Sequence, residues 1–341
     1  MTMTLLRNGR DALLDASIVC SFDRSGFLRH ARAFSAGDLE VDLAGRVCLV
    51  TGANSGIGYE TSLALAQRGA SVWMLCRNRA RGERALAQVR QQSRSRRVQL
   101  VLLDVADLDA VRAFAAGFAE PRIDVLVHNA GVLPDQRLAS AQDHEVTLAT
   151  HVYGPWLLTR ALLPRLRAST DARVVFVSSG GMYTQRLDVA DCEWRRRTYD
   201  GVQAYAQTKR MQVVLAELLA EECQADRITV SSMHPGWADT PAVRSSLPRF
   251  WGALQGRLRT PAQGADTVVW LAASDAARSQ SGRFWFDRKP RSTHLLPWTR
   301  EPAAARSALR DLCDRATSGY LPAAASGAAG IRPRRRAASR R

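Results

Sequence analysis

A tyrosine and a lysine four residues apart have the types and spacing that could do chemistry in this sequence. Tyr205 and Lys209 would lie next to each other on one face of a helix. A phenol titrates at a pKa of about 10, and a neighbouring ammonium lowers that pKa toward the range used for proton transfer. Of the six tyrosines, Tyr205 alone has a lysine at this spacing. The pair predicts a proton donor and acceptor for carbonyl or alcohol chemistry.

Two serines at the end of an apolar run could bind the substrate oxygen. Residues 173–177 predict a buried strand, and Ser178 and Ser179 follow it directly. Ligands of open α/β sheets bind beyond the carboxyl ends of the strands. The spacing leaves open which of the two hydroxyls faces the substrate. Residues 180–200, which come before the helix of Tyr205, predict a loop over the pocket.

A glycine-rich turn predicts a site for the pyrophosphate of a dinucleotide. Gly52, Gly56 and Gly58 follow the apolar run 47–50 and lead into a helical pattern. Glycines let the backbone turn tightly and approach the phosphates, while the helix N-terminus supplies free N–H groups and a positive dipole end. The alternative is a tight turn without a ligand. The position at the first strand-to-helix junction favours the dinucleotide.

The residue placed to contact the adenosine ribose is an arginine. The second apolar run ends at Arg77 and Asn78, where an acidic side chain would bind the ribose hydroxyl of NAD. A guanidinium instead offers charge-assisted hydrogen bonds to a phosphate. The sequence therefore predicts NADP(H) in preference to NAD(H). The alternative is that Arg77 is only a surface residue of an arginine-rich chain.

These residues need a scaffold in which strand ends meet. Short apolar runs alternate with helical patterns about six times between residues 41 and 300. Such runs are typical of parallel strands that are covered on both faces. We therefore expect an α/β fold, a Rossmann-type doubly wound parallel sheet with helices on both faces, as a single domain over 41–300. Residues 1–40 form an N-terminal extension, and residues 301–341 an Arg/Ala-rich, largely disordered tail.

The motif TGxxxGxG at residues 51–58 resembles the first loop of the short-chain dehydrogenase/reductase superfamily, and the resemblance spans about residues 44–290. It implies that Ser179 hydrogen-bonds the substrate carbonyl, Tyr205 acts as general acid or base, and Lys209 tunes Tyr205 and holds the nicotinamide ribose. Residues 178–182 and 231–241 are similar to the subgroup called dehydrogenase/reductase family member twelve. The cofactor-binding residues implied by the resemblance are Gly52, Asn54, Ser55, Gly56, Ile57, Gly58, Arg77, Asn78, Asp104, Val105, Asn129, Ala130, Gly131, Tyr205, Lys209, Pro235, Gly236 and Thr240.

One position departs from the family's pattern. Where the family has an asparagine that helps to hold a water in the proton relay, this sequence has His151. An imidazole titrates at about pH 6.5, so His151 is either a member of the relay or a buried polar group that fills the space. The departure also supports a second hypothesis, a dinucleotide-binding regulator or scaffold without turnover. The complete Ser179, Tyr205 and Lys209 set favours the enzyme.

The composition predicts a soluble cytoplasmic protein. Of 341 residues, 46% are hydrophobic and 23% are charged, and no apolar run is long enough for a transmembrane span. The N-terminus lacks the pattern of a secretory signal. Six cysteines without CxxC spacing predict reduced thiols and no metal site.

The net charge of +16 raises the alternative of a nucleic-acid or membrane-surface protein. Residues 331–341 hold six arginines, no acid and no aromatic residue, so they predict a solvated tail without a base-stacking platform. We therefore expect no specific nucleic-acid partner. The expected partner is a small-molecule carbonyl or alcohol substrate. The family resemblance also allows a homodimer, through the helix of Tyr205 and the helix within residues 146–167.

Overall fold

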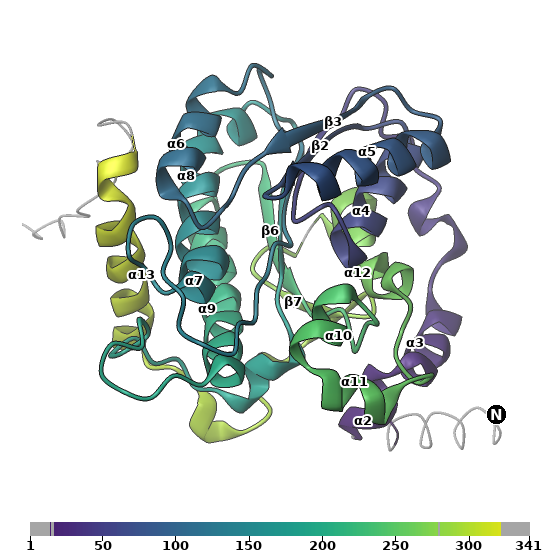
Figure 1. The fold of residues 1–341 in the computed structure, drawn as a ribbon. Coiled ribbons are helices and arrows are strands. Elements are labelled where there is room, and N and C mark those ends of the chain that lie inside the picture. The colour runs from purple at the N-terminus through teal and green to yellow at the C-terminus, as the bar shows by residue number, and fades with distance from the viewer. Residues whose placement is uncertain (1–13, 15–16, 279, 322–341) are drawn as a thin grey trace, which may run out of the picture.

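An eight-stranded sheet forms the centre of the molecule (Figure 1). The computed structural model describes residue 14, residues 17–278 and residues 280–321. The strands are β1 (Val47–Thr51), β2 (Ser71–Cys76), β3 (Val98–Leu102), β4 (Val125–His128), β5 (Ala172–Val177), β6 (Ile228–Met233), β7 (Phe284–Phe286) and β8 (Lys289–Arg291). Their order is β3-β2-β1-β4-β5-β6-β7-β8, and every neighbouring pair is parallel except β7 and β8.

Helices cover both faces of this sheet. Three of them, α4 (Gly56–Gln67), α5 (Arg79–Ser93) and α12 (Pro261–Ala273), lie to the right of the sheet in Figure 1. On the other face lie α6 (Leu108–Gly117), α8 (Gly154–Arg167) and α9 (Gly201–Glu222). The remaining α-helices described are α2 (Ile18–Phe22), α3 (Arg24–His30), α7 (Val146–Leu148), α10 (Pro241–Ser246), α11 (Pro248–Leu254) and α13 (Ala303–Thr317).

Alternating side chains of each strand enter two separate hydrophobic cores. Leu126 and Phe176 belong to the core under α8 and α9, whereas Val127 and Val175 belong to the core under α12. Strands buried on both faces give the continuous apolar runs seen in the sequence. The predicted doubly wound fold is therefore confirmed.

Strand β1 lies between β2 and β4, so the chain extends the sheet in both directions from its first strand. The chain that leaves β1 therefore runs to one side of the sheet, and the chain that leaves β4 runs to the other. In open α/β sheets, ligands bind at the carboxyl ends of two such strands. The predicted glycine loop and Asn129 both follow strands at this point. The topology thus places the predicted dinucleotide residues at the switch point of the sheet.

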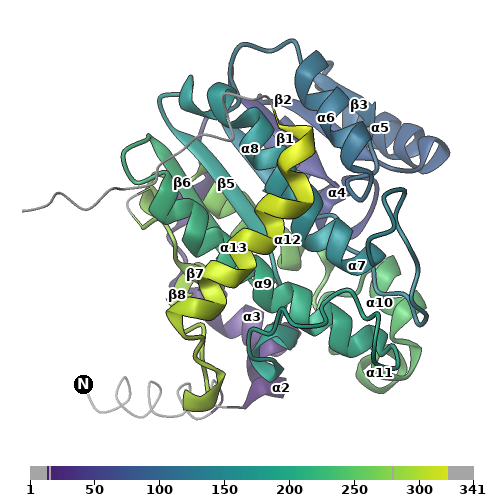
Figure 2. The same ribbon diagram turned by 90° about the vertical axis from the view of Figure 1, so that its left-hand side faces the viewer.

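Residues 17–40 form two short helices and two 3-10 turns. Ser17 accepts a hydrogen bond from the N–H of Cys20 and begins α2, while Asp23 accepts from the N–H of Gly26 and begins α3. Both helices lie at the same end of the molecule as α10 and α11 (Figures 1 and 2).

Helix α13 lies across α8 and α9 (Figure 2). Its residues Leu309 and Cys313 are fully buried, and the Trp156 indole of α8 donates a hydrogen bond of 3.0 Å to Asp314 of α13. The face that α8 and α9 would offer to a second copy of the chain is thus covered by the chain's own helix. Residues 322–341, which include the arginine-rich part of the predicted tail, lie outside the described residues.

All six cysteines lie within the described residues and are free thiols; five are buried, and Cys20 is half-buried. Among the described residues, no helix has the length and apolar character required to cross a membrane.

Candidate active site

The predicted catalytic residues meet at the carboxyl ends of β4, β5 and β6. Ser178 and Ser179 directly follow β5, and Tyr205 and Lys209 lie on α9, which packs against β5 and β6. The Ser179 hydroxyl lies beside the Tyr205 phenol. Ser178 is buried and its hydroxyl instead donates 2.8 Å to the carbonyl of Lys209. The geometry thus separates the two serines, because Ser178 anchors α9 and Ser179 faces the phenol.

Tyr205 is half-buried. Burial raises the pKa of its phenol above the ordinary value, and the neighbouring Ser179 hydroxyl acts in the opposite direction. The sequence predicted that Lys209 would lower this pKa. In the structure burial is the larger effect, so the direction is upward and the phenol is the protonated, proton-donating form at neutral pH.

Lys209 is also buried, and burial lowers the pKa of its ammonium from 10.5 to about 7. Its Nζ donates 2.9 Å to the carbonyl of Val177 and 3.0 Å to Oε1 of Gln212. Nζ lies 5.4 Å from the centroid of the Tyr205 ring. The lysine therefore sits beside the phenol with both of these oxygens as anchors.

His151 lies in a π-helical turn, Ala149–Tyr153, and has no exposed surface. Its Nε2 accepts a hydrogen bond of 3.1 Å from the N–H of Val132. Its Nδ1 lies 2.8 Å from the hydroxyl of Thr208, which donates to the carbonyl of Tyr205. Nδ1 must then be the protonated nitrogen. Burial, followed by the charge of Lys209, lowers the pKa of His151 well below its ordinary value, so the imidazole is neutral.

The glycine loop has the backbone that a phosphate site requires. Gly52 and Gly56 adopt φ values of +65° and +56°, which favour glycine. Ser55 begins α4 without a side-chain hydrogen bond to the helix, so the first N–H groups are not capped by it. A Cβ on Gly58 would lie 2.3 Å from Nδ2 of Asn129. Asn54 lies in the glycine-rich turn, and Ile57 lies in the first turn of α4.

Asn129 connects two strand ends. Its Nδ2 donates 2.9 Å to the carbonyl of Thr51, and its own N–H donates 2.9 Å to the Thr51 hydroxyl. The next N–H, of Ala130, donates to the same hydroxyl. A Cβ on Gly131 would lie 3.1 Å from Nε2 of His151 and 3.8 Å from Nζ of Lys209, so this strand end lies next to both side chains.

The residues predicted to contact the adenosine lie at the ends of β2 and β3. Arg77 is 54% exposed, and its NH1 lies 3.7 Å from a carboxylate oxygen of Asp104. The Asn78 side chain accepts from the N–H of Arg81 and caps α5, so it has a structural role as well. Val105 is buried directly after Asp104.

The loop after β6 reaches the glycine loop. Thr240 caps α10 by accepting from the N–H of Val243, and a Cβ on Gly56 would lie 3.1 Å from its methyl group. Pro235 and Gly236 precede it, and Gly236 has φ of +74°. Phe22 and Arg259 contact this loop from elements outside the motifs, and Arg259 was not singled out from the sequence.

The loop predicted over residues 180–200 is held by hydrogen bonds to Glu145 and by a contact between two of its own side chains, Arg197 and Trp194. Glu193 accepts from the N–H of Glu145 at 2.7 Å, and Arg197 lies 3.8 Å above the ring of Trp194. Tyr199 donates 2.9 Å to Glu145. These contacts fix the segment against the residues that begin α7.

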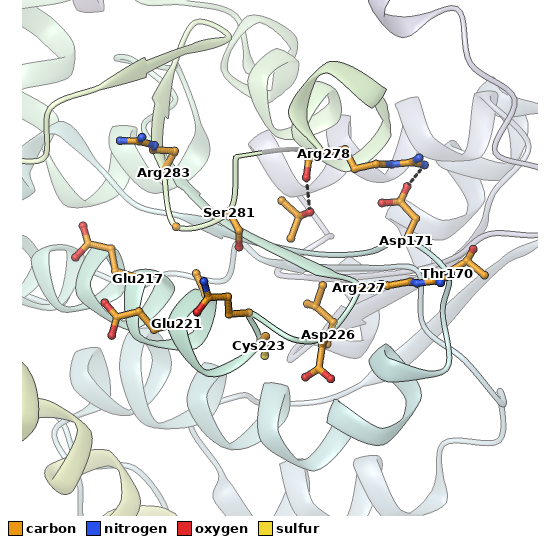
Figure 3. Close-up of a pocket in the computed structure, with 15 residues that line it drawn as sticks. Thr170, Asp171, Glu217, Glu221, Cys223, Asp226, Arg227, Arg278, Ser281 and Arg283 are labelled. Atoms are coloured by element: carbon orange, nitrogen blue, oxygen red, sulfur yellow. Dashed lines mark hydrogen bonds and ion pairs between the residues drawn. The ribbon is translucent and has the colours of Figure 1, made fainter. Parts of the chain in front are cut away.

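A groove of about 870 Å³ lies at the opposite end of the strands (Figure 3). Its walls include Thr170 and Asp171, which come before β5, and Arg227, which comes before β6. Ser179 follows β5 at its other end. The groove is therefore separate from the catalytic residues, and it mixes acidic and basic side chains.

The fold and this residue set define a class of protein, and comparison with known proteins agrees with it. A family model described as short chain dehydrogenase matches residues 46–249. The chain therefore belongs to the short-chain dehydrogenase family, and it is an NAD(P)-dependent oxidoreductase that acts on CH–OH groups.

Individual relatives share most of the chain. Dehydrogenase/reductase SDR family member 12 of Homo sapiens is 44% identical over 276 residues, which cover 80% of this chain and 86% of the relative. Retinol dehydrogenase 12 of Homo sapiens is 35% identical over 265 residues, 76% of this chain and 84% of the relative. These similarities confirm the family and subgroup that the sequence resembles.

Solved structures show the same fold. An uncharacterized protein from Mycobacterium paratuberculosis superposes with a TM-score of 0.68 at 28% identity, covering 84% of this chain and 97% of that one. A short chain dehydrogenase from Escherichia coli CFT073, complexed with NADPH, gives 0.59 at 27% identity, covering 75% and 100%.

Proposed function

We propose that this protein is an NADP(H)-preferring oxidoreductase that interconverts an alcohol and a ketone or aldehyde, with Ser179, Tyr205 and Lys209 as its catalytic set. The observation that carries the proposal is the convergence of three side chains: the Ser179 hydroxyl lies beside the Tyr205 phenol, and Nζ of the buried Lys209 lies 5.4 Å from the centroid of the Tyr205 ring. These groups lie at the carboxyl edge of the sheet, next to the strand ends that carry the glycine loop.

The residues present fit a dinucleotide. The positive φ values of Gly52 and Gly56 and the N-terminus of α4 would hold the pyrophosphate. Asp104 and Val105 would contact the adenine, and Lys209 the nicotinamide ribose. Gly131, Pro235, Gly236 and Thr240 line the side nearest the catalytic helix. The bound cofactor supplies the hydride.

The chain's own side chains handle the proton. In the reductive direction the Tyr205 hydroxyl donates its proton to the substrate oxygen, where negative charge develops. Ser179 donates a hydrogen bond to the same oxygen and keeps it next to the phenol. When Lys209 is protonated, its charge favours the phenolate that remains. Because the pKa of Tyr205 is raised, its phenol is protonated before the reaction and has a proton to donate.

His151 is proposed as a positioning residue in place of a relay member. Both of its ring nitrogens already have partners: Val132, in the segment that follows β4, and Thr208, on α9. These bonds hold the end of β4 at a fixed distance from α9. We therefore expect superimposable pH–rate profiles near neutrality for the wild type and for His151→Asn.

The preference for NADP(H) rests on Arg77. Its side chain is exposed at the end of β2, where the ribose of the adenosine would lie. Three of the similar solved structures are complexes with NADP or NADPH. The cytoplasmic location stays a prediction.

The test is a titration with NADPH and with NADH, followed by a screen of ketones and aldehydes for consumption of the reduced cofactor. Tyr205→Phe removes the transferable proton, so it should abolish reduction while leaving NADPH affinity within about twofold. Substantial turnover by Tyr205→Phe would remove this residue from its role. NADPH binding by the wild type without turnover of any carbonyl would favour the dinucleotide-binding regulator.

A further inference from the structure

The segment that precedes β1 contacts the turn that follows Ser179. Phe22, the last residue of α2, lies so close to Gly180 that a Cβ there would be 2.7 Å from Cε2 of the phenyl ring. The ring also packs edge-on against His234, with 4.3 Å between centroids. Nδ1 of His234 accepts a hydrogen bond of 2.9 Å from the N–H of Gly180. Phe22 and His234 together fix the backbone immediately after Ser179.

The same residue also holds the loop after β6. The carbonyl of Phe22 accepts a hydrogen bond of 2.8 Å from the N–H of Trp237, and the two rings pack edge-to-face at 5.9 Å. Trp237 lies between Gly236 and Thr240, two of the proposed cofactor contacts. One side chain of α2 therefore touches both walls of the proposed active site.

A buried arginine fastens this segment to the body of the protein. Arg259 is 1% exposed and donates to the carbonyls of three consecutive residues, Ser21, Phe22 and Asp23. It also makes two hydrogen bonds, of 2.6 and 2.9 Å, with the carboxylate of Asp287.

The same carboxylate binds α3 as well. Asp287 lies 2.6 Å from Nδ1 of His30, the last residue of α3. Gly236 passes close beneath Arg259, because a Cβ at that position would lie 2.3 Å from Nε. A buried charge that is paired and hydrogen-bonded on several sides fixes one arrangement of the groups around it.

We propose that residues 17–30 are a positioning element of the active site, in which Phe22 holds the Ser179–Gly180 turn and the Trp237 loop in the geometry needed for turnover. The inference rests on the proposed function. The family model begins at residue 46, so this element lies outside the part of the chain that it matches. The element acts through Gly180 and Trp237 and does not touch the reacting atoms.

The test compares Phe22→Ala with Phe34→Ala. Phe34 belongs to the same segment but packs on Phe27 and under Arg288, away from Ser179. Phe22→Ala should lower kcat by about 10- to 100-fold, as expected for a small displacement of a catalytic group, with NADPH affinity within about twofold. Phe34→Ala should keep kcat within about twofold, and Phe22→Leu, which fills most of the space, should recover most of the loss.

Hydrogen exchange gives a readout that does not need turnover. Amides in residues 178–184 and 234–240 should exchange faster in Phe22→Ala than in the wild type, and Phe34→Ala should leave them unchanged. Unchanged exchange in both segments of Phe22→Ala overturns the inference, as does an equal loss of kcat in the two alanine variants. A wild-type protein that reduces no carbonyl overturns the proposed function, and the exchange comparison still decides the positioning role.

Discussion

At the scale of single residues, the proposed preference for NADP(H) rests on Arg77. It is the exposed cation at the end of β2, and Asp104 is its carboxylate neighbour at 3.7 Å. Arg77→Asp would replace a phosphate partner with a repelling carboxylate and should weaken NADPH binding by about 10- to 100-fold, because a hydrogen bond to a charged group contributes roughly 1.5–3 kcal/mol. NADH affinity should change far less. Isothermal titration with both cofactors measures the difference.

Arg79→Asp is the matched control for this substitution. Arg79 is 71% exposed on α5, and its nearest carboxylate is Glu83, at 3.6 Å. The control makes the same change in net charge two residues away, so it should shift both affinities slightly and equally. Equal affinities of the unmutated protein for NADPH and NADH would contradict the assignment to Arg77.

Lys209 makes stability depend on pH. Its pKa is about 7 in the folded protein, against an ordinary 10.5. Between these values the unfolded chain binds one more proton than the folded chain, so folding stability rises with pH by about 1.4 kcal/mol per unit. Below about pH 7 both states are protonated and the slope disappears.

Urea unfolding of the wild type and of Lys209→Met isolates this contribution. The free energy of unfolding of the wild type, minus that of Lys209→Met, should increase as the pH rises from about 7.5 to 9. The variant cannot titrate at this position, and the other ionisable groups cancel in the difference. Parallel pH dependences would show that Lys209 keeps its ordinary pKa in the fold.

At the scale of elements, Gly58 sets the distance between α4 and the end of β4. A Cβ there would meet Nδ2 of Asn129 at 2.3 Å and the carbonyl oxygen of Gly52 at 2.5 Å. Gly58→Ala should therefore push the loop and the helix apart, with a loss of about 1–3 kcal/mol of stability and weaker binding of NADPH. Thermal unfolding and cofactor titration measure both effects.

Gly117→Ala provides the comparison within a helix. No atom lies within 4 Å of a Cβ built on Gly117, the last residue of α6. Alanine there should leave stability unchanged or raise it by up to about 1 kcal/mol, because glycine is the weaker helix former. If Gly58→Ala were equally harmless, the close approach of loop and strand would not be required.

Strands and helices could be predicted from the sequence where one or both of their faces are buried. They were harder to predict where they depend on contacts with residues distant in the sequence. β1 and β5 are buried throughout, so their apolar runs marked them. β8 was missed because its sequence, Lys289 to Arg291 around Pro290, is exposed and pairs only at the sheet edge. The motifs located Tyr205 and the glycine loop. Phe22 and Arg259 belong to none of the motifs, and the hydrogen bond that joins them spans 237 positions of the sequence.

His151 shows why a single position can stay open at the level of sequence. Its type alone was compatible with a relay or with packing. The choice depends on which atoms face its two nitrogens, and these come from Val132 and Thr208. Such partners follow from the π-helical turn, which shifts the ring relative to a regular helix.

At the scale of the whole molecule, α13 determines whether the chain can pair through α8 and α9. Leu309 of α13 is fully buried, and Arg306 of α13 pairs with Glu221 of α9 at 2.8 Å. We therefore expect a monomer, in place of the homodimer that the family resemblance allowed. Leu309→Asp would place a charge in this apolar contact and release α13, so the variant should dimerise or aggregate.

Light scattering coupled to size exclusion measures the mass of each form. Ser307→Asp introduces the same charge on the exposed side of α13 and should remain monomeric. A wild-type dimer that persists in Leu309→Asp would show that the protein associates through another face.

The six thiols differ in burial, so we expect a thiol reagent to modify one of them selectively. Burial raises the pKa of Cys76 and Cys223 to about 11 and that of Cys192 to about 12, and Cys48 and Cys313 are raised as well. Alkylating reagents attack the thiolate and need access to it, so these five should react slowly in the folded protein. Cys20 is the half-exposed one, on α2, two residues before Phe22. A maleimide dye should therefore label the native chain at Cys20, and its emission would follow α2 docking against the body without any engineered cysteine.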